Sequence, residues 1–167
     1  VEPMHDAGTR YLLERRRVPP GLPFYVSAAS ITDPGLAPPG HTTLFGLVPV
    51  PALGDLGPVD WAAEVARLRA QVLGRLRDEG FAMDEGRIVF ERVWTPVDWR
   101  DRFGLHDGSA FGAAHTMFQL GPFRLPNADP ALRGLYYVGA STTPGTGLPL
   151  VTLGGRMTAE RVLSDAR

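Results

Sequence analysis

The segment 137–151 carries the residue types whose spacing is best suited to chemistry. It predicts a short strand, a glycine-rich turn and the start of a helix. Gly139, Gly145 and Gly147 have no side chains, so another group can approach the backbone closely. Pro149 fits the first turn of the helix. The N-terminus of that helix presents unpaired N–H groups and the positive end of a dipole, which together favour a bound negative charge.

A tight turn that binds nothing is an equally good interpretation of these residues alone. Leu150 stands where a Gly-x-Gly-x-x-Gly fingerprint needs its third glycine, so a stand-alone nucleotide-binding domain is not expected. Gly154 and Gly155 fall inside the expected helix, where each costs about 1 kcal/mol relative to alanine. A closely packed neighbour is therefore expected beside them.

The histidines and aromatic residues offer weaker candidates. His5, His41, His106 and His115 have no metal-ligand spacing, so no metal site is expected. His115 is the candidate proton acceptor, although a structural role is the favoured interpretation. Four apolar side chains near it either line a long apolar tunnel or form ordinary core, and the sequence leaves both open: Phe111, Met117, Phe118 and Phe123.

The elements that must position these residues are indicated by local patterns. A helix is expected over 60–79, with Asp60 as its N-cap and Gly80 just beyond its C-cap. Its apolar face consists of Trp61, Val65, Leu68, Val72 and Leu76. Strands are expected at 24–28, 42–48, 88–94 and 135–139, the first two pairing antiparallel across the loop 31–41.

The remaining segments have less regular patterns. A final helix is expected over 150–165, and 95–134 has no helical period and is expected to be irregular. In 1–22 a helix beginning near Tyr11 is expected to end at Arg15–Arg17. That arginine triplet is either a solvated helix end or a contact with an anionic membrane surface.

Composition bounds the class of protein. The chain has 167 residues, a formal net charge of −1, no cysteine and 44% apolar residues, which fits a folded domain or part of a larger one. The missing cysteines exclude a disulfide framework and a cysteine nucleophile in this chain. The balanced charge argues against nucleic acid as a partner. The first residue is Val1 rather than methionine, which fits a fragment as well as a processed chain.

Four segments resemble, in order, the C-terminal part of the bacterial-type phytoene desaturases, which are FAD-dependent carotenoid desaturases. They are a Thr-Pro-x-Asp-aromatic motif at 95–100, a Gly-Ser-Ala-Phe segment at 108–112, a Gln, Phe-Arg and Asn-x-Asp stretch at 119–129, and the glycine-rich motif at 135–149. The likeness covers about residues 24–163. Four matches in the same order make chance improbable.

The resemblance implies FAD as the cofactor and places seven residues along it: Gly139, Ala140, Gly145, Gly147, Leu148, Pro149 and Leu150. The helix N-terminus near Leu150 would face the pyrimidine end of the flavin ring and stabilise the negative charge that develops there. Desaturation removes two hydrogens from a hydrocarbon, and the electron acceptor must be a redox cofactor. The family's N-terminal pyrophosphate-binding unit is absent here, so that missing part is the expected partner.

Two positions depart from related patterns. Ala140 stands where wider flavin amine-oxidase relatives often have an acidic residue, as it does in the carotenoid desaturases. Thr143 stands where many desaturases have histidine, and its role stays open.

The expected fold class is α/β, with α+β character in the N-terminal half. Residues 1–110 are expected to be part of a substrate-binding domain with a mixed sheet. Residues 111–134 are expected to connect it, near the active site, to 135–167, the closing strand, turn and helix of a Rossmann-like FAD-binding domain.

The expected function is FAD-dependent desaturation of a carotenoid precursor such as phytoene. A related flavoprotein, retinol-saturase-like or carotenoid-oxidising, and an inactive remnant without the pyrophosphate loop stay open as alternatives. A water-insoluble substrate implies a cytoplasmic enzyme attached peripherally to the membrane. The loop 31–41 or Arg15–Arg17 is the expected contact.

Overall fold

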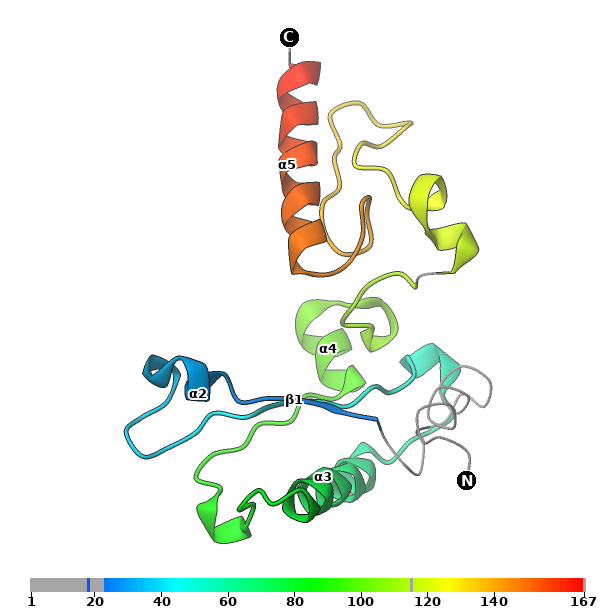
Figure 1. Cartoon of the computed structure of the whole chain (residues 1–167). Coiled ribbons are helices and arrows are strands. Elements are labelled where there is room, and N and C mark those ends of the chain that lie inside the picture. Colours follow the sequence, from blue (N-terminus) through cyan, green and yellow to red (C-terminus); the bar gives the residue numbers. More distant parts are fainter. Residues whose placement is uncertain (1–17, 19–22, 115, 167) are drawn as a thin grey trace. The chain divides into compact units, whose positions relative to one another are not determined.

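The computed structural model describes residues 18, 23–114 and 116–166, and it divides the chain between Thr95 and Pro96 into two units (Figure 1). The expectations for 1–22 and for His115 lie outside the described residues. The helices and strands are β1 (Tyr25–Ser27), α2 (Ala29–Thr32), β2 (Phe45–Leu47), α3 (Trp61–Asp78), α4 (Pro96–Phe103) and α5 (Leu148–Asp165).

The first unit contains a small antiparallel sheet. Strands β1 and β2 pair with Val26 opposite Gly46, which confirms the predicted hairpin, although both strands are shorter than expected. The connection between them is built by side chains. The Ser30 hydroxyl accepts from Thr43 N at 2.9 Å, and the Thr43 hydroxyl donates to Leu36 O at 2.8 Å.

Helix α3 begins and ends where the sequence predicts. The Asp60 carboxylate accepts from the first-turn amides of Ala62 and Ala63, at 3.0 and 3.1 Å. At the other end Gly80, with φ +88°, allows Gly80 N to donate to Arg77 O and Phe81 N to donate to Leu76 O. These two bonds form a Schellman motif.

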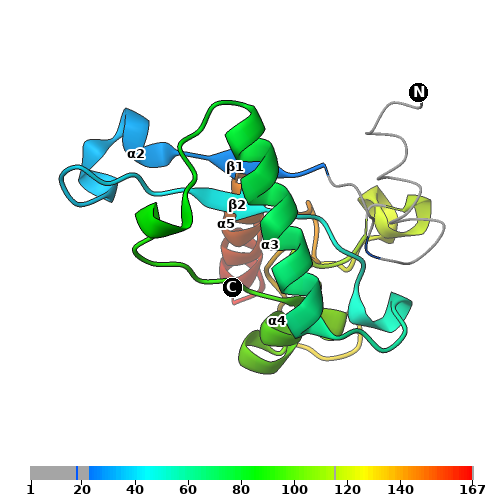
Figure 2. The ribbon, with the colours of Figure 1, turned by 90° about the horizontal axis from the view of Figure 1, so that it is seen from below.

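The inward face of α3 holds the buried apolar side chains of the described residues: Leu68, Leu73 and Leu76. Leu68 and Leu76 belong to the predicted stripe. The helix crosses the two strands of the hairpin (Figure 2), and an apolar groove of about 560 Å³ lies between the C-terminal half of α3 and β1. The Arg75 guanidinium sits 5.3 Å from the Phe24 ring centroid at this contact.

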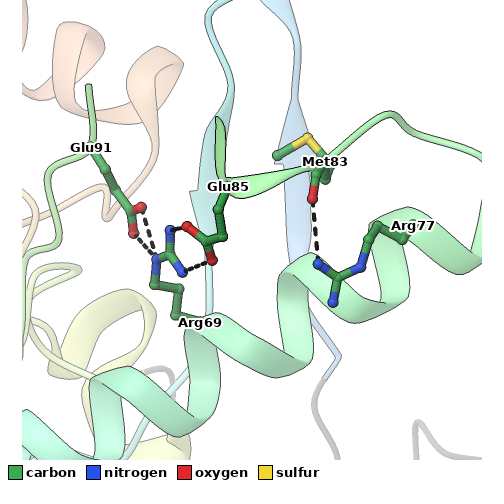
Figure 3. A network of polar contacts seen from close by, with 5 residues as sticks. All are labelled: Arg69, Arg77, Met83, Glu85 and Glu91. Atoms are coloured by element: carbon green, nitrogen blue, oxygen red, sulfur yellow. Dashed lines mark hydrogen bonds and ion pairs between the residues drawn. The ribbon is translucent and has the colours of Figure 1, made fainter. Parts of the chain in front are cut away.

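The strand expected at 88–94 does not form. The segment is held to α3 by side chains instead (Figure 3): Arg69 donates from Nη1 to Glu85 at 2.7 Å and from Nε to Glu91 at 2.8 Å. Val89 and Phe90 are exposed. A strand needs a neighbouring edge for its backbone bonds, and among the described residues this segment pairs with none.

The second unit contains a helix that the sequence patterns did not predict. Helix α4 falls in the stretch expected to be irregular, with Pro96 at its start and Asp98 in its first turn. Both features favour a helix N-terminus. The rings of Trp99 and Phe103, one helical turn apart, lie 5.2 Å from each other.

Residues 135–139 form one isolated bridge with the other described residues rather than the expected strand. Tyr136 bridges Ala128, and Tyr137 N donates to Asn127 O at 2.9 Å. Helix α5 follows the turn, close to its expected range, with Pro149 in its first turn. The structure thus combines helices with one two-stranded sheet, which is compatible with an α/β fragment. No helix among the described residues is long and apolar enough to cross a membrane.

Candidate functional site: a glycine-rich turn held by three other segments

The second unit brings the segments of the resemblance into direct contact with one another. Gly108 is buried with φ +67°, and a Cβ there would collide with the carbonyl group of Pro96 in α4. A Cβ on Gly112 would lie 2.7 Å from Ser141 Oγ, in the glycine-rich turn. Ala113 N also donates to Ser141 Oγ, at 3.2 Å. Glycine suits both positions, because each has a positive φ and a side chain would press on the Pro96 backbone at Gly108 or on the Ser141 hydroxyl at Gly112.

Arg124 forms the centre of this assembly. Its side chain is 4% exposed. It donates from Nε to Thr142 O at 3.0 Å, from Nη1 to Gln119 O at 3.0 Å and from Nη2 to Ala140 O. The guanidinium therefore joins the 119–129 segment to two carbonyls of the turn.

Asn127 makes a second connection between the same two segments. Its amide nitrogen donates to Thr143 O at 2.9 Å and to Tyr137 O at 3.3 Å. In return, Thr143 N donates to Leu125 O at 3.0 Å. Thr143 therefore helps to hold the turn through its backbone, and its hydroxyl also donates to Leu125 O, at 3.3 Å.

Asp129 makes the third connection. The Tyr137 hydroxyl donates to its carboxylate at 2.7 Å, and the amides of Ala131 and Leu132 donate to the other carboxylate oxygen. The Tyr137 hydrogen bond, followed by the two amides, lowers the pKa of Asp129 below its ordinary value. The same contact raises the pKa of Tyr137.

Helix α5 packs against the turn through one of its two adjacent glycines. A Cβ at Gly154 would lie 3.2 Å from Pro144 Cδ and 3.4 Å from Thr143 O, whereas one at Gly155 would meet nothing within 4 Å. Thr158 Oγ1 also donates to Tyr137 O at 3.3 Å. The expected close neighbour is thus found at Gly154 and not at Gly155.

The seven residues expected to contact a cofactor lie together, but their surroundings differ. Gly139 and Gly147 have positive φ angles and open space where a Cβ would point. Gly147 is the N-cap of α5 and makes no side-chain cap, and Leu148 beside it is 82% exposed. Gly145 is buried, with its would-be Cβ 3.8 Å from Arg124 Nε and 3.7 Å from Leu150 Cδ1.

The expected tunnel residues are all exposed in this unit: Phe111, Met117, Phe118 and Phe123. Among them, the Phe118 and Phe123 rings contact edge to face at 6.2 Å. Phe123 and Arg124 also line a hollow of about 560 Å³ next to Ser141. None of the four forms a buried core among the described residues.

Sequence reasoning assigned no roles to Arg124, Asn127 and Asp129. The sequence does contain a signal for these roles: the three polar side chains lie within five residues of one another in an otherwise apolar, proline-containing stretch. Buried polar groups must be hydrogen-bonded, so such residues predict cross-links to another segment. The apolar groove beside α3 was also missed because its lining comes from separate elements.

Comparison with known proteins agrees with the resemblance. No protein-family model matches the chain. The chain is 43% identical over 151 residues to a zeta-carotene-forming phytoene desaturase of Myxococcus xanthus, covering 90% of this chain and 29% of that protein. It is 38% identical over 141 residues to a lycopene-forming phytoene desaturase of Pseudescherichia vulneris, covering 84% and 28%.

A third relative carries a different name. The 4,4'-diapolycopen-4-al dehydrogenase of Metabacillus indicus is 37% identical over 155 residues, covering 92% of this chain and 30% of that protein. The chain therefore spans less than a third of the length of these relatives. It corresponds to the C-terminal part of the carotenoid desaturases.

Proposed function

We propose that this chain is the C-terminal part of a flavin-dependent enzyme that desaturates a carotenoid precursor such as phytoene. The observation that carries the proposal is the 43% identity to a phytoene desaturase over 90% of the chain. The assembly in the second unit supports it, because the contacts of Gly108, Gly112 and Arg124 join the same segments that carry the resemblance.

The glycine-rich turn has the chemistry that a flavin site needs. Open space at Gly139 and Gly147 lets a ring or ribityl chain reach the backbone. The uncapped N-terminus of α5 offers N–H donors and a positive dipole end. We assign FAD binding to the turn, through the seven residues Gly139, Ala140, Gly145, Gly147, Leu148, Pro149 and Leu150. Bound FAD would supply the electron acceptor for the removal of two hydrogens.

The chain's own residues would bind and orient in this scheme. Gly139, Gly147 and the first turn of α5 would contact the flavin, and exposed Leu148 and Leu150 would cover it with apolar surface. Gly145 would act indirectly, since it packs against Arg124. His115 remains the candidate proton acceptor.

The proposed domain roles follow the sequence expectation. Residues 1–110 would belong to the substrate-binding domain, 111–134 would connect near the active site, and 135–167 would close a Rossmann-like FAD-binding domain. The N-terminal portion of the enzyme would supply the pyrophosphate site and is the proposed partner of this chain.

The proposed substrate is apolar, and apolar surface is available for it. The four expected substrate-lining side chains are exposed and are not packed in a core of their own unit. They are Phe111, Met117, Phe118 and Phe123. The hairpin loop presents Ile31 at 74% exposure, together with Leu36, which fits a cytoplasmic enzyme that touches the membrane peripherally. Co-sedimentation of the enzyme with lipid vesicles tests this attachment, and an entirely soluble enzyme would contradict it.

Oxidation of a carotenoid aldehyde is the second candidate. It is favoured by the 37% identity to the 4,4'-diapolycopen-4-al dehydrogenase. Both candidates use an apolar polyene and an electron acceptor, but only desaturation lengthens the conjugated chain without adding oxygen.

Product analysis tests the proposal. The enzyme that ends in this chain is incubated with FAD and vesicles containing phytoene, and in parallel with a carotenoid aldehyde. Desaturation predicts products that are lighter by two mass units per step and absorb at longer wavelength. Conversion of the aldehyde alone to an acid would favour the second candidate, and no conversion of either would contradict both.

A further inference from the structure

In the described part of the chain, the guanidinium of Arg124 is buried without a counter-charge, which a simple cross-link between two segments does not require. It is 4% exposed, and its recorded partners are three neutral carbonyls: Thr142 O, Gln119 O and Ala140 O. Among the described residues no carboxylate lies within ion-pair distance of it. A buried charge without a counter-charge is costly, and the carbonyl dipoles offset that cost only in part.

The planar guanidinium group of Arg124 also fixes the orientation of the turn. Nε and Nη2 bind the carbonyls of Thr142 and Ala140, which lie two residues apart. Because a peptide group is planar, a carbonyl held toward the guanidinium turns the following N–H to the opposite side. Lysine would give one ammonium without the fork, so it cannot hold both carbonyls in the same geometry.

The position of the charge links it to the proposed cofactor site. The backbone at Gly145 lies against the guanidinium, since a Cβ there would be 3.8 Å from Nε and 3.9 Å from Cζ. Gly145 is two residues before Gly147, the N-cap of α5. The positive charge therefore lies behind the turn, on the same structural unit as the helix dipole.

We propose that Arg124 is the positioning residue of the flavin site: it orients the peptide groups of the turn and places a fixed positive charge behind it, without touching the flavin. The proposal rests on the assignment of FAD to this turn. A fixed cation in a dry site stabilises an electron-rich group more strongly than it would in water. Arg124 would thus make bound flavin easier to reduce.

The test uses the enzyme that ends in this chain, as the parent and as Arg124→Met, Arg124→Lys and Arg156→Met variants. Arg156→Met is the matched control, since it removes one positive charge from an exposed position on α5. The first readout is the two-electron reduction equilibrium of bound flavin, measured against dyes of known potential. The second is amide exchange at Thr142 and Thr143, which donate to Gly139 O and Leu125 O, measured without flavin.

We expect Arg124→Met to shift the equilibrium toward oxidised flavin by at least about tenfold, which is about 30 mV for a two-electron couple, and to speed exchange at both amides. Arg124→Lys should speed exchange while keeping most of the potential, because it retains the charge. Arg156→Met should change neither readout, because its charge is screened by solvent.

An equilibrium unchanged in Arg124→Met, or shifted equally by Arg156→Met, would overturn the proposal. If Arg124→Met does not fold, Arg124→Lys decides: parent-like exchange at Thr142 and Thr143 overturns the positioning role. A parent enzyme that binds no flavin would instead refute the proposed function, and the exchange measurement would still decide whether Arg124 orients the turn.

Discussion

A single amide side chain illustrates how the turn is held. Asn127 donates to the carbonyls of Thr143 and Tyr137 from one nitrogen. We predict that Asn127→Ala lowers the free energy of unfolding by roughly 1–3 kcal/mol, because the part-buried Thr143 carbonyl loses this donor while the Tyr137 carbonyl keeps, among the described residues, only Thr158 Oγ1 as a side-chain donor. Asn127→Asp should be worse, since it keeps the shape but turns an acceptor toward both carbonyls. Urea denaturation measures both, and equal stabilities of the two variants would contradict the assignment.

Asp129 gives this unit a pH dependence. Its pKa is lowered in the folded chain, chiefly by the Tyr137 hydroxyl. A lowered pKa stabilises the fold above the ordinary value of 3.8, and that contribution is lost as pH falls through the folded pKa.

We therefore predict that the stability difference between the parent and Asp129→Asn is constant near pH 7 and shrinks on acidification below about pH 4. Denaturation midpoints across this range measure it. A difference that grows toward acid would show that the Tyr137 contact does not favour the ionised form.

At the scale of elements, α5 offers a matched pair of glycines. Alanine at Gly155 meets open space, so it should stabilise the helix by about 0.5–1 kcal/mol. Alanine at Gly154 would press on the Pro144 ring and the Thr143 carbonyl, at 3.2 and 3.4 Å. We predict that Gly154→Ala destabilises the protein. Thermal melts of both variants test this, and equal gains would show that α5 does not pack on the turn as described.

Elements whose signals are local could be predicted from the sequence. Helix α3 followed from Asp60, the apolar stripe and Gly80: both ends have their expected contacts, and Leu68 and Leu76 of the stripe are buried. The hairpin followed from two apolar runs flanking turn residues. Helix α4 was missed, because eight residues are too few to show a helical period.

Strands that depend on distant partners could not be predicted in this way. The apolar runs at 88–94 and 135–139 have strand composition, but a ladder needs a neighbouring edge. The described residues supply only one bridge to the second run and none to the first. Arg69, Glu85 and Glu91 hold the first run instead, through contacts separated by 16 and 22 residues.

Only part of the candidate site could be predicted from the sequence. The glycines and Pro149 indicated the turn, because their effect on the backbone is intrinsic. The roles of Arg124 and Asn127 depend on which carbonyls the fold brings near them, and a single sequence does not show this.

At the scale of the molecule, the burial pattern indicates surfaces that need partners. The buried apolar side chains among the described residues are three leucines of α3. In the second unit the buried side chains are mainly polar, as in Arg124, Thr142 and Thr158, while Leu148, Leu153 and Met157 remain exposed. The second unit is therefore held together mainly by polar contacts, while apolar side chains remain on its surface. Such a surface is typical of a segment that packs against further protein.

We predict that the 167-residue chain by itself binds FAD only weakly and self-associates at micromolar concentration. Its turn lacks a pyrophosphate site, and its apolar surfaces are uncovered. Flavin fluorescence titration and sedimentation velocity measure the two effects. Micromolar FAD affinity in a monomeric chain would contradict the proposed need for the N-terminal portion of the enzyme.

The most direct test of the account is amide hydrogen exchange of the enzyme that ends in this chain, with and without FAD. The account predicts that FAD slows exchange across 139–151, where the glycine-rich turn meets the first turn of α5, and leaves α3 unchanged. FAD binding that protects other segments while 139–151 exchanges at the same rate would contradict the central claim that this turn holds the cofactor.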